Sequence, residues 1–105
     1  MLTQNPDATL ILVVEDDDSH AELIQRSFEA SQEEYRLEFA GSLRDARYAL
    51  ELHPPDLILT DYRLPDGDGK ELVGVVGRTC PVILMTSQGN EQLAVEAMKA
   101  GAQDY

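Results

Sequence analysis

The chain contains three short apolar runs, and each predicts a buried strand. The runs are Leu10 to Val14, Leu57 to Leu59 with Thr60, and Val82 to Met85 with Thr86. Each run is continuous rather than alternating, which is typical of strands that are covered on both faces in a parallel sheet. A fourth run, residues 36–40, alternates Leu37 and Phe39 with polar neighbours, and this pattern favours an edge strand.

Helical patterns separate these runs, and each begins near a polar residue that can cap it. In the first helix, Asp18 or Ser19 is the cap, and Ala21, Ile24 and Phe28 form the apolar face. In the second, Ser42 is the cap and Leu43, Ala46 and Leu50 form the face. In the third, Asn90 is the cap and Ala94, Ala97 and Met98 form the face. A weaker helix covers Lys70 to Val76, because Gly74 and Gly77 each cost about 1 kcal/mol relative to alanine. This alternation predicts an α/β fold with a doubly wound parallel sheet and right-handed crossovers.

Length and charge narrow the choice of function. The 105 residues suit one domain, and we expect residues 1–8 to form a flexible leader and residues 9–105 to form the folded part. The net charge of −12 argues against binding to nucleic acid or to an anionic membrane surface. The single cysteine, Cys80, lies beside an apolar run, which predicts a buried thiol in a reducing, cytoplasmic compartment.

Acidic and hydroxyl side chains follow the predicted strands. The first strand is followed by residues 15–18, all acidic, the second by Asp61, and the third by Thr86 and Ser87. Ligands of an open parallel sheet bind beyond the carboxyl ends of its strands, so these groups should converge. A cation would relieve the repulsion among the carboxylates, and hard oxygen ligands suit Mg²⁺ or Mn²⁺ better than Zn²⁺. Asp17 and Asp18 could instead only cap the first helix.

Three segments, in this order and spacing, resemble the receiver domains of two-component response regulators. The segments are Val14-Glu15-Asp16-Asp17, residues 56–69 (DLILTDYRLPDGDG) and residues 81–87 (PVILMTS). The resemblance extends from Leu10 to Tyr105. It implies a flavodoxin-like sheet of strand order 2-1-3-4-5, of which the fifth strand and the last helix are largely missing from this chain.

The resemblance also implies roles for individual residues. Asp61 would be the phosphoacceptor, and Mg²⁺ would be held by Glu15, Asp16, Asp61 and the backbone carbonyl of Arg63. The remaining implied roles are Thr86 as the hydroxyl that senses the phosphoryl group, Tyr105 as the aromatic switch, Arg63 and Gln88 as residues that tune dephosphorylation, and Pro65 and Gly69 as residues that shape the loop.

The chemistry of a carboxylate nucleophile agrees with this assignment. A carboxylate attacks a phosphoryl group poorly unless a divalent ion screens both partners and orients in-line attack. We therefore expect a module that takes a phosphoryl group from a histidine kinase or a phosphotransfer protein and responds with a conformational switch, catalysing only its own phosphorylation and dephosphorylation. Two alternatives stay open: a Mg²⁺-dependent phosphohydrolase with an aspartyl nucleophile, although such enzymes commonly carry an acid where Arg63 stands, and a receiver-like interaction module that is never phosphorylated.

Some features depart from the family or favour a purely structural interpretation. The family's lysine would stand a few residues beyond Tyr105, and without most of the fifth strand we expect residues 82–85 to form a sheet edge through which the chain self-associates. His20 and His53 fit solvated residues at helix ends. Residues 66–69 (DGDG) predict a turn rather than a calcium loop, because the acid that ends such a loop is missing.

Overall fold

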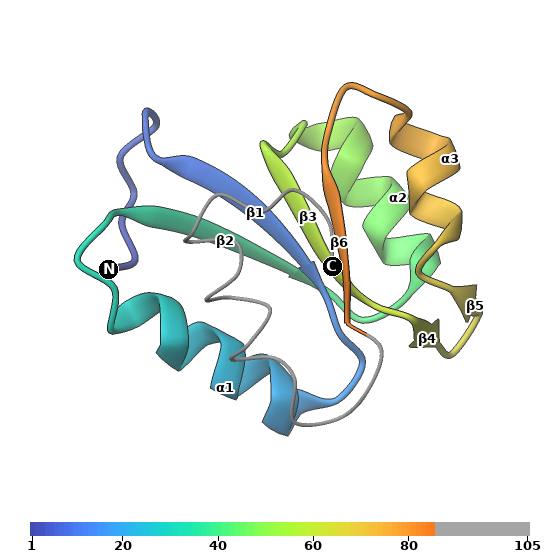
Figure 1. The fold of residues 1–105 in the computed structure, drawn as a ribbon, viewed down its shortest axis with the longest axis horizontal. Helices are drawn as coiled ribbons and strands as arrows, with labels where there is room; N and C mark the ends of the chain where they lie inside the picture. Colours follow the sequence, from blue (N-terminus) through green and yellow to red (C-terminus); the bar gives the residue numbers. More distant parts are fainter. Residues whose placement is uncertain (86–105) are drawn as a thin grey trace.

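A four-stranded parallel sheet forms the centre of the molecule in the computed structural model, which describes residues 1–85 (Figure 1). The strands are β1 (Thr9–Val14), β2 (Tyr35–Ala40), β3 (Leu57–Asp61) and β6 (Val82–Met85). Their order, β2-β1-β3-β6, corresponds to the first four strands of the predicted 2-1-3-4-5 arrangement. The four predicted strands are confirmed, with ends that shift by one residue. β6 is outermost among the described strands, and self-association through it stays a prediction.

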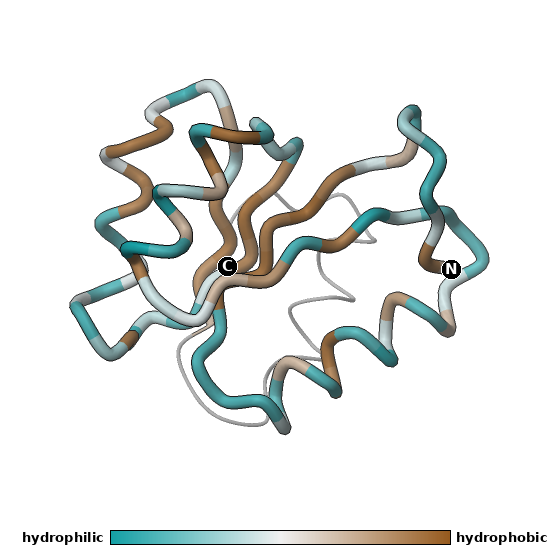
Figure 2. Tube along the Cα trace, turned by 180° about the vertical axis from the view of Figure 1, so that it is seen from behind, coloured by the Kyte–Doolittle hydropathy of each residue, from teal (hydrophilic) through white to brown (hydrophobic). Residues whose placement is uncertain are grey.

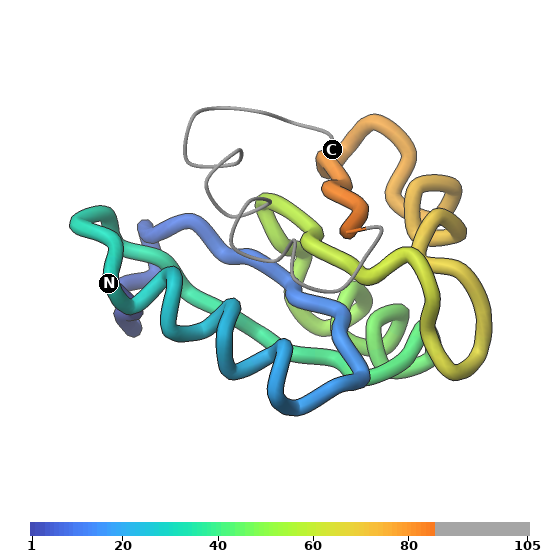
Figure 3. Tube along the Cα trace, turned by 60° about the horizontal axis from the view of Figure 1, so that its bottom comes forward, coloured from blue at the N-terminus to red at the C-terminus, as the bar shows by residue number. Residues whose placement is uncertain are grey.

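Helices cover both faces of the sheet. They are α1 (Asp18–Glu29), α2 (Leu43–Leu52) and the short α3 (Glu71–Val76). Figures 1 and 3 show α1 on one side of the strands and α2 with α3 on the other. The helix predicted to begin after Asn90 lies outside the described residues.

Two apolar clusters follow from this arrangement, because successive side chains of a strand point to opposite faces. Ile11 and Val13 of β1 pack in the cluster that contains Phe28 of α1. Leu12 and Val14 pack in the second cluster with residues of α2 and α3. Figure 2 shows the resulting hydrophobic stretches along the central strands. The continuous apolar runs of the sequence are therefore explained by burial on both faces, at about 1.5–3 kcal/mol for each large side chain.

Side chains cap the starts of α1 and α2. The Asp17 carboxylate accepts hydrogen bonds from the backbone N–H groups of Ser19 (2.8 Å) and His20 (3.1 Å). Asp17 thus takes the capping role that the sequence left open for it, one residue before the Asp18 or Ser19 cap, and Asp18 lies in the first turn of α1. Ser42 caps α2 as predicted, with its hydroxyl accepting from the N–H of Asp45 at 3.1 Å.

The first three residues lie beside β2, which corrects the expectation of a flexible leader for this part of the chain. Leu2 forms a parallel bridge with Tyr35, and it packs against the cluster on the α1 side of the sheet. The Thr3 N–H donates to the Tyr35 carbonyl at 3.0 Å, and the Tyr35 N–H donates to the Met1 carbonyl at 2.8 Å. An apolar side chain and an open strand edge are sufficient reason for this pairing.

Two further observations concern the burial of Cys80 and the length of the helices. Cys80 is buried as predicted, and burial raises the pKa of its thiol. In the part of the chain that the structure describes, no helix has the length and hydropathy needed to cross a bilayer.

Candidate functional site

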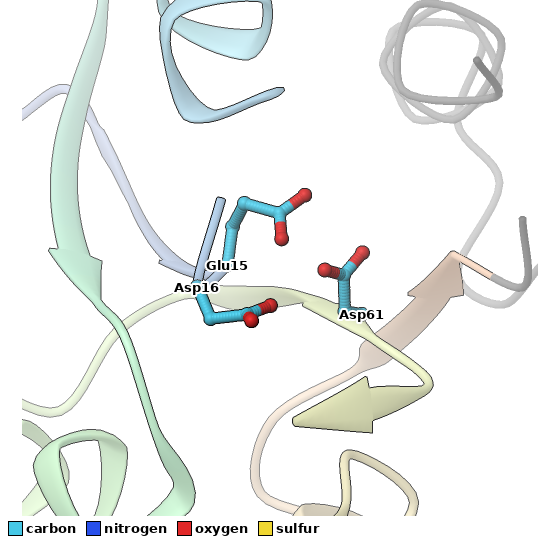
Figure 4. A group of neighbouring side chains, drawn as sticks. All are labelled: Glu15, Asp16 and Asp61. Atoms are coloured by element: carbon cyan, nitrogen blue, oxygen red, sulfur yellow. The ribbon is translucent and has the colours of Figure 1, made fainter. Parts of the chain in front are cut away.

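Glu15, Asp16 and Asp61 meet at the carboxyl end of the sheet. Val14 of β1 and Thr60 of β3 are paired in register, so the acidic residues that follow them lie at the same level. One carboxylate oxygen from each of the three acids lies within 4.8 Å of the other two. Figure 4 shows the three side chains facing a common space between the ends of β1 and β3. The predicted convergence is confirmed for this part of the site.

Burial and hydrogen bonds fix the position of Glu15. The residue is only 6% exposed, and its backbone N–H donates to the Ala40 carbonyl of β2 at 2.9 Å. Its Oε2 accepts from the N–H of Asp17 at 3.3 Å. Its Oε1 is buried and has no hydrogen-bond donor within the described part of the chain. A buried carboxylate oxygen in this state is costly unless a cation or a proton compensates it.

His20 lies against Glu15, which corrects the expectation of a solvated histidine. Its Nδ1 is 3.4 Å from Glu15 Oε1, and its side chain is 20% exposed. The Asp17 cap could have indicated this contact, because it places His20 in the first turn of α1, close to the residues that precede the helix. His53 agrees better with the prediction, since its side chain is 66% exposed, with Nδ1 3.3 Å from Glu38 Oε1.

The electrostatics of the cluster favour a cation. Burial, and then the hydrogen bond and negative charge of the neighbouring Asp61 carboxyl, raise the pKa of Glu15 from 4.5 to about 8, against smaller opposing effects of the Asp17 N–H and His20. A raised pKa means that the metal-free cluster resists carrying its full negative charge. Three hard oxygen ligands and one orphaned carboxylate oxygen fit a small divalent cation such as Mg²⁺ or Mn²⁺.

The segment after Asp61 is held by backbone contacts. Asp61 is paired with Met85 of β6, and the next N–H, that of Tyr62, donates to the Met85 carbonyl at 2.8 Å. The N–H of Gly69 donates to the Tyr62 carbonyl at 2.7 Å, which brings the chain back against β3. A Cβ on Gly69 would overlap the Asp61 carbonyl oxygen and come within 2.7 Å of Thr60 Oγ1. Only glycine fits so close to the acidic site.

A two-stranded antiparallel ribbon, β4 (Arg63–Leu64) and β5 (Gly67–Asp68), forms the predicted turn. Asp66 at its tip accepts hydrogen bonds from the N–H groups of Leu43 (2.8 Å) and Arg44 (3.0 Å) at the start of α2. These two donors lower the pKa of Asp66, the Leu43 N–H most strongly. The sequence gives no sign of this contact, because it joins residues more than twenty positions apart.

The other predicted site residues have mixed outcomes. Asp17 serves as the helix cap, and neither it nor Asp18 joins the three-carboxylate group. Arg63 follows the site with an exposed side chain, and the role of its carbonyl stays a prediction. Thr86, Gln88 and Tyr105 lie outside the described residues.

Comparisons with known proteins agree on one family. Residues 11–105 match the response regulator receiver domain. The chain is 42% identical over 108 residues to the methanogenesis regulatory protein FilR1 of Methanothrix harundinacea, an alignment that covers 97% of this chain and 24% of FilR1. The chain therefore spans about a quarter of the length of this relative.

Solved structures show the same likeness. A response regulator from Chloroflexus aurantiacus superposes with a TM-score of 0.72 at 29% identity, over 94% of this chain and 84% of that one. The Mn²⁺-bound form of response regulator Rcp1 superposes with a TM-score of 0.69 at 25% identity, over 92% of this chain and 78% of that one.

Proposed function

Because this chain belongs to the response regulator receiver domain family, we propose that Asp61 is the residue through which it accepts a phosphoryl group, in a Mg²⁺-dependent reaction. Receiver domains are signalling modules rather than conventional enzymes. The phosphoryl donor is a histidine kinase or a phosphotransfer protein. The buried thiol of Cys80 supports a cytoplasmic location for this exchange.

The observation that carries the proposal is the grouping of Asp61 with Glu15 and Asp16. Asp61 is the acid that follows the apolar strand β3, and it is partly exposed, so its carboxylate can meet a donor. Glu15 is buried behind it, and Asp16 is exposed beside it. The nucleophile thus comes from the end of β3, and the other two cation ligands directly follow β1, the neighbouring strand of the sheet.

The three acids would share the cation, and Asp61 would also be the nucleophile. Glu15 and Asp16 would hold the cation with Asp61, which fixes the orientation of the Asp61 carboxylate for in-line attack. When bound, Mg²⁺ supplies charge neutralisation between the carboxylates and the phosphoryl oxygens. Gly69 lets the following loop approach the Asp61 backbone closely, because it has no Cβ to meet the Asp61 carbonyl.

The downstream response is expected from residues beyond β6. Thr86 would turn its hydroxyl to the phosphoryl group and Tyr105 would follow. Two residues would set how fast water reaches the acyl phosphate, Gln88 beyond β6 and Arg63 shortly after β3. Phosphorylation adds about −1.5 to −2 charges, which is enough to bias such a two-state element.

Intact-mass analysis tests the proposal directly. The protein is exposed to a small phosphodonor such as acetyl phosphate, with Mg²⁺ in one sample and with a chelator in the other. We expect one phosphoryl group to be added per chain, and only with Mg²⁺. No label in either sample, for a chain shown to be folded, would contradict the proposal.

A further inference from the structure

A hollow of about 310 Å³ lies next to the acidic site, between α1 and the end of β2. Most of its lining residues are acidic or apolar, and the full set is Glu15, Asp16, Asp18, Ala21, Glu22, Gln25, Phe39, Ala40 and Gly41. Four of these residues are carboxylates and none is basic. At about 30 Å³ for each water molecule, the hollow has room for a planar side-chain group of several atoms, more than a bare cation needs.

Phe39 is the unusual member of this wall. It is two residues from Leu37 on the same strand, and Leu37 packs against the α1-side cluster, so both face the side of the sheet that α1 covers. Phe39 nevertheless remains 44% exposed, because α1 leaves this corner of the sheet open. An aromatic face beside carboxylates is a suitable surface for a cation, which the ring quadrupole attracts.

Glu15 gives a second indication of a cationic occupant. It is 6% exposed and lines the hollow, and within the described residues its Oε1 has no hydrogen-bond donor, although His20 Nδ1 lies 3.4 Å away. Glu15, Asp16 and Asp61 would share one divalent cation, but Asp18 and Glu22 extend the negative wall along α1, beyond that group. Glu22 is paired with Arg26, at 2.5 Å on the same exposed face of the helix, and this pair only partly offsets the charge.

We propose that this hollow binds an arginine side chain presented by a protein partner, with the guanidinium stacked on Phe39 and paired with the α1 carboxylates. Arginine fits better than a second metal ion, because a planar guanidinium can stack on an aromatic face and bond to carboxylates at the same time. Binding of an arginine in the hollow does not depend on the proposed function. Only its consequence does, because a docked partner would then lie beside the phosphoacceptor Asp61. The hollow would help to select which proteins reach the phosphoacceptor.

The test uses a small probe in place of the unidentified partner. Backbone amide NMR spectra of the protein are recorded without Mg²⁺ and in saturating Mg²⁺ while Nα-acetyl-arginine amide is added, and the neutral analogue Nα-acetyl-citrulline amide is titrated in parallel. We expect the arginine probe alone to shift the amides of Ala21, Gln25 and Gly41. Equal shifts from citrulline, or shifts that Mg²⁺ abolishes, would overturn the proposal, the latter because the probe would then occupy only the metal ligands.

Paired variants identify the groups that bind the probe. Phe39→Leu keeps an apolar side chain and removes the aromatic face, so the affinity for the probe should fall about twofold to fivefold. Tyr48→Leu removes another exposed aromatic, 63% exposed on α2, and should change nothing. Asp18→Asn should weaken binding, whereas Glu29→Gln at the far end of α1 should not. Equal effects of Phe39→Leu and Tyr48→Leu, or of Asp18→Asn and Glu29→Gln, would overturn the proposal. Labelling of the unmodified protein by acetyl phosphate tests the proposed function separately.

Discussion

Glu15 and Asp61 lie at the same level of the sheet, because each directly follows one member of a registered pair on neighbouring parallel strands. That pair is Val14 of β1 and Thr60 of β3. The register alone brings two carboxylates to the same level at the end of the sheet. Their proximity, together with burial, raises the pKa of Glu15 to about 8. The repulsion that a cation would relieve is therefore built into the strand pairing.

Mg²⁺ should stabilise the fold. Binding to the native state alone adds RT ln(1 + [L]/Kd), which is about 2.7 kcal/mol at a roughly hundredfold excess over Kd. Thermal melts in millimolar Mg²⁺ should show a raised Tm for the unmodified chain. The rise should be much smaller for Glu15→Gln and should persist in Glu29→Gln, which removes an exposed acid at the end of α1. Equal rises in all three proteins would contradict a site at Glu15.

Without a divalent ion, stability should fall as pH rises. Glu15 has a higher pKa folded, about 8, than its ordinary 4.5, so its protonated form favours the native state. The contribution is complete below the ordinary pKa and is lost as pH passes through the folded value. Melts from about pH 5 to about pH 9 in chelator should show this decline, and Glu15→Gln should flatten it. Parallel pH curves for the two proteins would show that another group is responsible.

Gly69 should be the least replaceable glycine among those described. A Cβ there would overlap the Asp61 carbonyl, so Gly69→Ala should cost about 1–3 kcal/mol in the free energy of unfolding, measured by urea denaturation. Gly74 is the matched control, because it lies in α3 and its Cβ would meet nothing within 4 Å. Gly74→Ala should stabilise the helix by up to about 1 kcal/mol. The reverse order of stability would contradict the close approach of the loop to β3.

Asp66 should stabilise the start of α2 from a distance. Its carboxylate accepts from Leu43 and Arg44, and these donors hold its pKa below the ordinary 3.8. The stabilisation is present above that ordinary value and is lost as pH falls through the folded one. Urea unfolding should show Asp66→Ala less stable than the parent at about pH 7, with the gap narrowing as pH falls below 3.8. Asp68→Ala, two residues away, serves as the control, and a gap that is independent of pH would exclude the charged cap.

The sequence predicts the strands well because their apolar runs are continuous, and Leu10 to Val14 needs only one more residue to match β1. The sequence leaves the cap of α1 open among Asp17, Asp18 and Ser19, because all three are good caps and only the path of the backbone selects Asp17. The pairing of Leu2 with Tyr35 has no local signature, because it depends on an open edge far along the chain.

The acidic group at the site is predictable for the same reason as the strands. The carboxylates of Glu15, Asp16 and Asp61 follow buried runs, and parallel strands bring their carboxyl ends together. The contact of His20 with Glu15 and the partial exposure of Phe39 depend on how α1 lies over the sheet, which sequence periodicity does not specify.

Mass spectrometry of the phosphorylated chain tests the central claim most directly, because it asks which residue is modified. The unmodified protein, Asp61→Asn and the control Asp68→Asn are exposed to acetyl phosphate in Mg²⁺, after melts have shown that all three are folded. The proposed role of Asp61 predicts one phosphoryl group on the unmodified protein and on Asp68→Asn, and none on Asp61→Asn. A phosphoryl group that persists on Asp61→Asn would contradict it.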